Sequence, residues 1–477
     1  MRKQTKWKRT ASVTLSHAFE KTPNNFDNVL NDLNATIKTK IQQAQTLVEF
    51  EKVEKEMHAA FVEAERLVLG EILEQYDIDA PFVMLDEKEY RQVLRCEQTY
   101  ISAVGQIRVE RSLYRAKNEM QSICPLELRA GIVEGSWSPT AAKQALLVVS
   151  QLTPYEAAHL FGELGGMQPS KSSLDRLPKK LSNEWECNRE LFESTLRQQT
   201  KIPEEAVAVA VSLDGVLVPM QGGVVLPGDS RYEEASCGTL TYYDEEGEPL
   251  ATRRYGRMSE HKKLTLKDFL KAELSHAINC QPDLQIVKVA DGAKDNWTFL
   301  DQTLPEGISV LDFYHAAQHL KKAFEIIYGV KSIEATIEFT RYRSILRHDK
   351  RGIEKIIQHL RYQLKKHPRK DSLKTELNYF KNNKQRCRYL EVSEANLPIG
   401  SGIVEATCKS LVSQRLKRSG MCWKENGGQA ILTFRALLQS DLFDMAWEML
   451  NKKYFSEIKL PNNVISFPKN HRKTVSE

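Results

Sequence analysis

Three acidic residues stand where a chain could hold a pair of divalent cations. Asp214 and Asp291 each follow an apolar, β-branched run and precede a glycine, in AVAVAVSLDG and LQIVKVADG. Glu405 follows the Gly-Ser-Gly run at 400–402, just inside a predicted helix that Ser401 can cap. Carboxylate oxygens are ligands that Mg²⁺ prefers, and two such ions about 4 Å apart stabilise the attacking and leaving oxygens of a phosphoryl transfer. The pattern therefore predicts a two-ion Mg²⁺ site, also open to Mn²⁺, that cuts and joins nucleic acid.

A D-x-x-H motif, formed by Asp312 and His315, follows the next predicted strand. Asp312 competes with Asp291 for the place of the second ligand, because it also follows an apolar strand. His315 could bind the metal, orient a carboxylate or contact a phosphate, although a lone histidine is more often structural. Asp-Gly pairs also form ordinary turns, and Glu405 also fits simple capping electrostatics. The glycine run at 400–402 lacks the GxxxxGK[ST] spacing, which excludes a phosphate-binding P-loop.

The elements that must position these acids alternate along the chain. Predicted strands cover 206–213, 235–243, 250–257, 284–290 and 308–313, and predicted helices cover 265–278 and 293–304. Three strands, a helix, a strand, a helix and a strand is the order of an RNase H-like domain. If the strands are adjacent and their connections right-handed, Asp214 and Asp291 lie at the same edge of the sheet.

Positive charge is concentrated in one segment. The whole sequence carries a net formal charge of +5, but 321–424 holds 24 lysines and arginines against 10 acidic residues, a net of +14. A basic segment beside a candidate metal site indicates nucleic-acid binding, although charge runs are usually solvated helical faces. The predicted DNA contacts from this segment are Arg341, Arg343, Arg347, Arg351, Arg415, Lys417 and Arg418.

The first half of the chain predicts helical modules. Residues 26–76 carry apolar residues at helical spacing, which predicts a long helix or helical hairpin, either for oligomerisation or as one side of a bundle. Residues 97–115 predict a short β-hairpin. Capping residues predict short helices at 139–151, 154–164 and 171–181. Three short helices with tight joints indicate a helix-turn-helix module, in which Lys171 and Arg176 would face DNA. The alternative is a helical connector that does not bind DNA.

Length and composition narrow the class of protein. A chain of 477 residues predicts about three domains. It contains no apolar run of about 18 residues, and the basic N-terminus lacks the apolar stretch of a secretory signal. Eight cysteines without a C-x-x-C pair indicate reduced thiols, so the expected location is the cytoplasm, associated with the nucleoid. We expect neither a membrane partner nor a small-molecule cofactor.

Four segments, in order, resemble bacterial insertion-sequence transposases of the ISKra type, which are related to Mutator-like DDE transposases. They are VSLDG, VKVADGAKDNW, VLDFYHAAQHL and LPIGSGIVEATCKSLVSQRLKRSGMCW. The resemblance runs from about 206 to 447 and, more loosely, over 138–181. It implies a metal-dependent RNase H-like core with Asp214, Asp291 and Glu405 as catalytic acids and metal ligands, supported by Asp312 and His315. It also implies double-stranded DNA as the partner and a homo-oligomer on paired DNA ends.

The chain departs from these relatives at one place. Where many of them carry zinc-ribbon cysteines before the helical module, this sequence has SLYRAKNEMQSICPLE, with Cys124 alone, so we predict no zinc site. The expected fold is a multidomain α/β protein with an all-helical insertion in an RNase H-like core. Its predicted parts are a disordered basic arm (1–25), a helical N-terminal region with a hairpin (26–125), a helix-turn-helix-like module (138–185), the first part of the core (203–316), a basic helical insertion (317–395), the Glu405 helix with the C-terminal helices (396–453) and a tail (454–477).

Three alternatives to a transposase stay open at this point. A structure-specific nuclease on the same fold would hydrolyse DNA without joining it. A transposase-derived DNA-binding protein would need none of the three acids, yet all three are present. An RNA-binding protein would use the same basic helices.

Overall fold

The computed structural model describes residues 24–43, 47–221, 231–366 and 371–459, which form two compact units. The first unit comprises Met1–Ala141, Leu160–Gln168 and Phe455–Glu477, and the second comprises Ala142–His159 and Pro169–Tyr454. The predicted arm at 1–25 lies outside the described residues except for its last two, which begin a helix, and most of the predicted tail also lies outside them. No described helix is long and apolar enough to cross a membrane.

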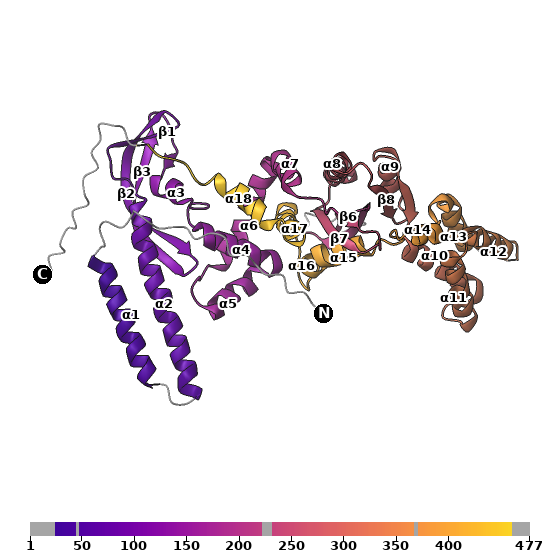
Figure 1. Ribbon diagram of the computed structural model, residues 1–477, viewed down its shortest axis with the longest axis horizontal. Helices are drawn as coiled ribbons and strands as arrows, with labels where there is room; N and C mark the ends of the chain where they lie inside the picture. The colour runs from indigo at the N-terminus through magenta and orange to yellow at the C-terminus, as the bar shows by residue number, and fades with distance from the viewer. Residues whose placement is uncertain (1–23, 44–46, 222–230, 367–370, 460–477) are drawn as a thin grey trace. The chain divides into compact units, whose positions relative to one another are not determined.

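The first unit joins a helical pair to a small sheet. Helices α1 (Asn24–Gln43) and α2 (Leu47–Gln75) lie side by side, as the predicted hairpin requires (Figure 1). Strands β1 (Phe82–Leu85), β2 (Lys88–Ser102), β3 (Gly105–Ala116) and β4 (Ser122–Ile123) form an antiparallel sheet in chain order, followed by α3 (Pro125–Ala130). The hairpin predicted at 97–115 is therefore longer than expected, because the charged residues of 88–95 occupy exposed strand positions and hide the pattern.

Three helices follow at nearly the predicted positions. They are α4 (Pro139–Gln151), α5 (Pro154–Leu164) and α6 (Lys171–Cys187). Ser170 caps α6 as predicted, accepting from the backbone N–H of Ser173 over 3.1 Å. Helix α6 extends past 181 because Leu174, Leu177, Leu181 and Trp185 bury one side of it. The segment 138–185 does not fall within one compact unit, since Leu160–Gln168 belongs to the first. Whether these helices read DNA stays a prediction.

The second unit contains a five-stranded sheet in the order β7-β6-β5-β8-β9. Its strands are β5 (Ala208–Pro219), β6 (Tyr232–Tyr243), β7 (Pro249–Arg257), β8 (Gln285–Ala290) and β9 (Ile308–Leu311). β5, β6 and β7 are antiparallel neighbours, whereas β8 pairs parallel with β5 and β9 pairs parallel with β8. Between the strands lie η1 (His261–Lys263), α8 (Leu264–Cys280) and α9 (Lys294–Gln302). The predicted alternation of strands and helices is therefore confirmed.

Alternate residues of the central strand supply two cores, one on each face of the sheet. Ala208 and Ala210 of β5 pack with Val287 and Val289 of β8 against the helices that follow β9. Val209, Val211 and Leu213 pack on the other face against α8 and α9. Because successive strand residues point to opposite faces, the apolar run AVAVAVSL is buried on both sides.

The predicted helical insertion consists of helices and short connections, with no strand among its described residues. It contains α10 (Phe313–Tyr328), α11 (Ile333–His348), α12 (Gly352–Lys366), α13 (Asp371–Asn382), η2 (Lys384–Arg386) and α14 (Tyr389–Glu394). Figure 1 shows these helices gathered on the β8 side of the sheet, away from β6 and β7. Strand β9 ends two residues before the predicted 313, because Asp312 already caps α10.

The chain then returns to the sheet on a helix with a π-helical segment. α15 (Gly402–Thr407) continues into η3 (Cys408–Ser413) and α16 (Gln414–Leu416). Val404, Cys408, Leu411 and Leu416 bury this helix against the ends of β5 and β6. The remaining helices of the unit are α7 (Arg189–Gln199), α17 (Glu425–Gln439) and α18 (Phe443–Lys452). Such π-helical turns are frequent at functional sites.

Candidate active site

Asp214 and Asp291 occupy equivalent positions on two neighbouring parallel strands. The last parallel pair of β5 and β8 is Ser212 with Val289, and each aspartate follows its partner of that pair by two residues. The sequence pattern placed Asp214 in a glycine turn at a strand end, and this is wrong. Asp214 lies inside β5, opposite Cys237 of β6, because β5 continues its antiparallel pairing after β8 has ended. The two acids therefore share the edge at which the strands part.

The carboxyl group of Asp214 is partly buried and lies near the charge of Asp291. Burial raises its pKa above the usual value, and the charge of Asp291 raises it further. The backbone N–H of Gly215, which donates to Oδ1 over 2.7 Å, and the charges of His315 and Lys263 work in the opposite direction. A cation at this position would relieve the same cost.

Asp291 begins the loop after β8 and is held by that loop. Its Oδ1 accepts from the backbone N–H of Ala293 over 3.0 Å and from the side-chain amide of Asn296 over 3.2 Å. Its carbonyl oxygen accepts from the indole N–H of Trp297 over 2.5 Å. No hydrogen bond to Oδ2 is present among the described residues, so one oxygen of this carboxylate is available to a ligand.

Asp312 is fully buried, and its carboxylate joins the start of α10 to Ser401 through hydrogen bonds. Its Oδ1 accepts from the backbone N–H of His315 over 2.6 Å, which caps α10. Its Oδ2 accepts from the hydroxyl of Ser401 over 2.7 Å and also from the backbone N–H of Ser401. The prediction that Ser401 caps the Glu405 helix is therefore wrong in its detail. Ser401 stands at the N-cap position, but its side chain makes no cap bond.

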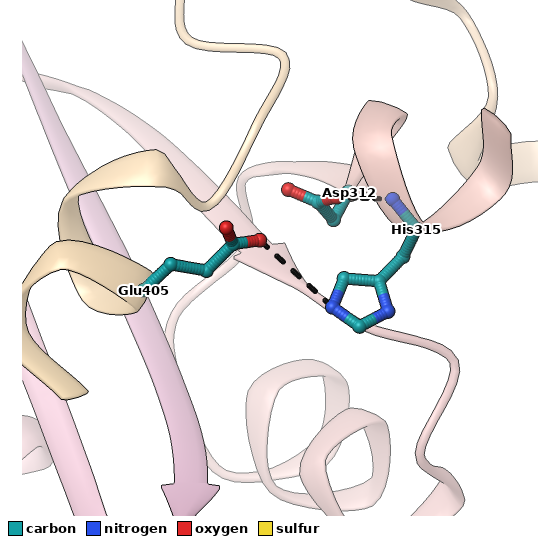
Figure 2. Close-up of side chains that lie close together, drawn as sticks. All are labelled: Asp312, His315 and Glu405. Carbon is teal, nitrogen blue, oxygen red and sulfur yellow. Dashed lines mark hydrogen bonds and ion pairs between the residues drawn. The ribbon is translucent and has the colours of Figure 1, made fainter. Parts of the chain in front are cut away.

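Glu405 projects from the first turns of α15 toward the D-x-x-H motif (Figure 2). Its Oε1 lies 3.2 Å from the hydroxyl of Ser401 and 3.8 Å from Nε2 of His315. The side chains of Glu405 and His315 are 44% and 36% exposed, so both remain open to a ligand. The acid that begins α15 and the histidine that begins α10 thus face each other.

The closest group of possible metal ligands differs from the predicted triad. Among the described residues, Asp312, His315 and Glu405 are the acids and histidine whose ligand atoms all lie within 4.8 Å of one another. Asp214, Asp291 and Glu405 are not gathered that tightly. The structure therefore brings together the two supporting residues with Glu405, and it brings Asp214 into electrostatic contact with Asp291 and His315.

The hydrogen bonds at Asp312 decide how well it fits a metal. A carboxylate offers about four lone-pair sites, and three donors from His315 and Ser401 already occupy Asp312. Asp214 and Asp291 have fewer protein donors and follow a shared strand register. All-oxygen ligand sets suit Mg²⁺ and Mn²⁺. Asp312 therefore keeps about one lone-pair site for a metal, whereas Asp214 and Asp291 keep more, and which acids hold an ion stays a prediction.

The helical insertion adds groups beside Asp291 that the sequence did not reveal. Tyr379 of α13 packs so closely on Gly292 that a Cβ there would lie 2.4 Å from the tyrosine ring. The same ring stacks on His319, with centroids 3.6 Å apart. His319 bonds to the buried Glu376 over 2.6 Å. The only sequence signal was the position of His319, one helical turn after His315; nothing indicated Tyr379.

The predicted DNA contacts fall into two groups. Arg341, Arg343, Arg347 and Arg351 are exposed on or just after α11, as a phosphate-binding surface requires. The guanidinium carbons of Arg343 and Arg347 each lie 5.7 Å from the ring centroid of Phe313, the residue next to Asp312. These two arginines therefore lie beside the residue that follows Asp312 in the chain.

The other predicted DNA contacts differ in how exposed and how free they are. Lys171, Arg176 and Lys417 are exposed. Arg418 is bound by both oxygens of Glu156, at 2.8 and 2.7 Å. Arg415 is only 2% exposed, so the prediction that it contacts DNA on the surface is wrong. It was predicted from charge alone, and its packing against Trp423 was not visible in the sequence.

Comparisons with known proteins include a distant structural likeness. No protein-family model matches the chain, and no curated protein matches it. Among solved structures, the Drosophila P element transposase strand transfer complex matches 68% of this chain and 82% of its own, at 13% identity and a TM-score of 0.27. A TM-score this low supports no conclusion about fold or function.

Proposed function

We propose that this protein is a DDE-type DNA transposase of the ISKra kind, which cleaves the ends of a mobile element and transfers them into target DNA. The observation that carries the proposal is the shared register of Asp214 and Asp291 at the edge where β5 and β8 part. The helix that carries Glu405 is buried against β5 and β6, with Val404 and Cys408 packed on residues of these strands. Three acids supplied by two strands and a covering helix suit metal-dependent phosphoryl transfer.

The strand order supports an RNase H-like core. The order of strands and helices along the chain is the one that the sequence pattern predicts, and the sheet has three antiparallel strands and two parallel ones in the order β7-β6-β5-β8-β9. The helical insertion leaves the core directly after Asp312 and returns at Ser401, immediately before the Glu405 helix. This connection agrees with the motif order of the insertion-sequence transposases that the chain resembles.

Asp214, Asp291 and Glu405 are the residues that would hold Mg²⁺, with Mn²⁺ as a substitute. Bound there, the ions would generate a nucleophilic oxygen and stabilise the developing charge on the phosphate. The protein residues orient this chemistry. Asp312 fixes Ser401, Ser401 contacts Glu405, and His315 faces the same carboxylate at 3.8 Å. His315 would therefore orient Glu405 or contact the scissile phosphate.

The insertion would hold the DNA. Arg343 and Arg347 lie over the ring of Phe313, the residue next to Asp312, and the segment 321–424 carries a net charge of +14. Phosphate contacts of this kind position DNA without specifying its sequence. Because cleavage and joining must act on two ends of one element, we also propose that the protein works as a homo-oligomer.

The experiment combines cleavage with strand transfer. Duplexes taken from the DNA that flanks the gene on each side are incubated with protein and Mg²⁺, Mn²⁺ or Ca²⁺, and pre-cleaved ends are supplied with target DNA in parallel. Wild-type protein should cut and should yield covalent end-to-target products with Mg²⁺ or Mn²⁺. Ca²⁺ should support binding with little chemistry, since its flexible coordination fits such a site poorly.

Single substitutions assign the acids. Asp214→Asn, Asp291→Asn and Glu405→Gln should each abolish cutting and joining while DNA binding persists. Wild-type activity in any of the three would remove that residue from the site. Hydrolysis without joined product would establish a nuclease instead, and DNA binding with neither reaction would establish a non-catalytic DNA-binding protein.

A further inference from the structure

A second candidate site lies in the second unit, and none of the acids of the candidate active site lines it. A cavity of about 560 Å³ opens between α6, the end of α4 and the chain that follows α16. Its basic lining residues are Lys171, Lys179 and Arg415, and the indole of Trp423 forms part of its wall. Pockets of this size take small ligands.

Arg415 is the unusual residue of this cavity. It is 2% exposed, yet no described acid pairs with it and its buried Nε–H has no partner. Its other polar contacts are weak, because Nη2 lies 3.4 Å from the carbonyl oxygen of Val149 and Nη1 lies 4.0 Å from the sulfur of Met421. Its guanidinium carbon also lies 5.3 Å from the centroid of the Trp423 ring. A buried charge without a counter-charge is costly unless a partner arrives.

The described residues around Arg415 add positive charge and offer it no free acid. Arg435 is also buried and bonds to carbonyl and amide oxygens, while Glu156 is committed to Arg418. Burial, together with the charges of Arg418 and Arg435, lowers the pKa of Arg415 to about 10, so it keeps its charge at neutral pH. Among the cavity residues, Asp175 is the single acid and already binds Lys179 over 2.6 Å.

We propose that this cavity binds a phosphate group through Arg415 and Lys171, with Trp423 beside it to receive an attached base. Guanidinium groups offer several fixed donors that match phosphate oxygens, and aromatic rings stack on nucleobases. The phosphate can come from a mononucleotide or from a nucleic-acid strand. Phosphate binding requires no cleavage, so the inference stands apart from the chemistry proposed at Asp214.

The test measures binding to the full-length protein at fixed ionic strength. Calorimetry and thermal unfolding are recorded with inorganic phosphate, dAMP, a single-stranded oligonucleotide and a duplex. The proposal expects dAMP to bind and to raise the Tm, and expects inorganic phosphate to compete with it. Lys171→Glu should weaken dAMP binding about tenfold or more, because a hydrogen bond to a charged group is lost and a repulsion added. Glutamate at the first position of α6 suits the helix N-terminus, so folding is not at risk.

Controls separate this site from the acids and from general charge effects. Lys180→Glu makes the same charge change at an exposed position of α6 that does not line the cavity, and it should bind dAMP as wild type does. Asp214→Asn should also bind dAMP normally. Arg415→Lys should keep part of the binding that Arg415→Gln loses. If oligonucleotides bind through Lys171 but dAMP and phosphate do not, the site belongs to a nucleic-acid strand. Equal binding of every probe by wild type and Lys171→Glu, or binding of none, would overturn the proposal.

Discussion

The hydroxyl of Ser401 donates a hydrogen bond to Oδ2 of Asp312 over 2.7 Å, which joins the two points where the helical insertion leaves and re-enters the core. The neighbouring backbone repeats the connection, because the N–H of Phe313 donates to the carbonyl oxygen of Ile399 over 3.0 Å. The entire insertion thus begins and ends beside the acids, and the start of the Glu405 helix is fixed by a buried carboxylate on the sheet.

Ser401→Ala tests this connection. The buried carboxylate of Asp312 would lose one donor, and Glu405 would lose its contact at 3.2 Å. We expect the free energy of unfolding to fall by about 1–3 kcal/mol, and cleavage to fall while DNA binding is kept. Chemical denaturation and the cleavage assay measure the two effects. Ser194→Ala is the matched control, since that hydroxyl donates to a carbonyl of its own helix. Unchanged stability in Ser401→Ala would show that Asp312 is held by other donors.

Asp214→Asn should stabilise the metal-free protein while it abolishes cleavage. Burial and Asp291 raise the pKa of Asp214 above its unfolded value, so the folded state binds this proton more tightly and its stability falls as the pH rises through the folded pKa. The substitution removes that cost. The gain in Tm should therefore be present at neutral pH and shrink as the pH falls through the raised pKa. It should disappear when Mg²⁺ is added, because only the wild type gains the ion.

Thermal unfolding with a chelator and then with Mg²⁺ measures this effect. Asp268→Asn, an exposed position on α8, is the control and should show no comparable pH-dependent gain. An Asp214→Asn protein that is less stable than wild type at neutral pH without metal would mean that the carboxylate is held favourably by its neighbours.

The sequence predicted the elements of this site better than their connections. Apolar runs of β-branched residues gave the strands that carry Asp214 and Asp291, because a strand buried on both faces has an unmistakable composition. The same pattern misplaced Asp214 in a turn, since the continued pairing of β5 with β6 depends on a partner distant in sequence. Local sequence carries no signal for that pairing.

Long-range contacts explain the other differences. The bond between Ser401 and Asp312 spans the entire insertion, and Tyr379 reaches Gly292 from α13. Arg415 looked like a surface charge because a charge count does not reveal which arginines are covered by packing. In each case the local helix or strand was predictable, and the side chain's environment was set by residues far along the chain.

Comparing cleavage by Asp312→Asn with cleavage by Asp291→Asn decides which aspartate is the second metal ligand. Both oxygens of Asp312 accept hydrogen bonds, so the NH₂ group of an asparagine there would face a donor and lose that bond. We therefore expect the free energy of unfolding to fall by about 1–3 kcal/mol, with some cleavage left. Asp291→Asn should leave stability nearly unchanged and cleavage absent. Denaturation and cleavage are measured on both. The opposite ranking of cleavage would place the metal at the cluster of Asp312, His315 and Glu405.

Charge reversal on α11 tests the DNA surface. Arg343 and Arg347 are exposed and lie over the ring of Phe313, next to Asp312. Arg343→Glu and Arg347→Glu should therefore each weaken the binding of every DNA sequence alike and lower the salt dependence of that binding. Lys271→Glu makes the same charge change on α8, which packs against the opposite face of the sheet, and should have little effect. Titrations over a range of salt concentrations measure it. If the two α11 variants bind DNA as the wild type does, these arginines only face solvent and do not contact DNA.

Gly292→Ala should disturb the site through Tyr379. A Cβ at 292 would lie 2.4 Å from the tyrosine ring, so either the loop carrying Asp291 or helix α13 must move. We expect a loss of about 1–3 kcal/mol of stability and a clear loss of cleavage. Gly402→Ala is the matched control, because a Cβ there meets nothing within 4 Å. Adding Tyr379→Ala to Gly292→Ala makes room for the new methyl group and should restore part of both losses. A double variant no better than Gly292→Ala would show that Asp291 depends on the glycine itself, and not on the approach of α13.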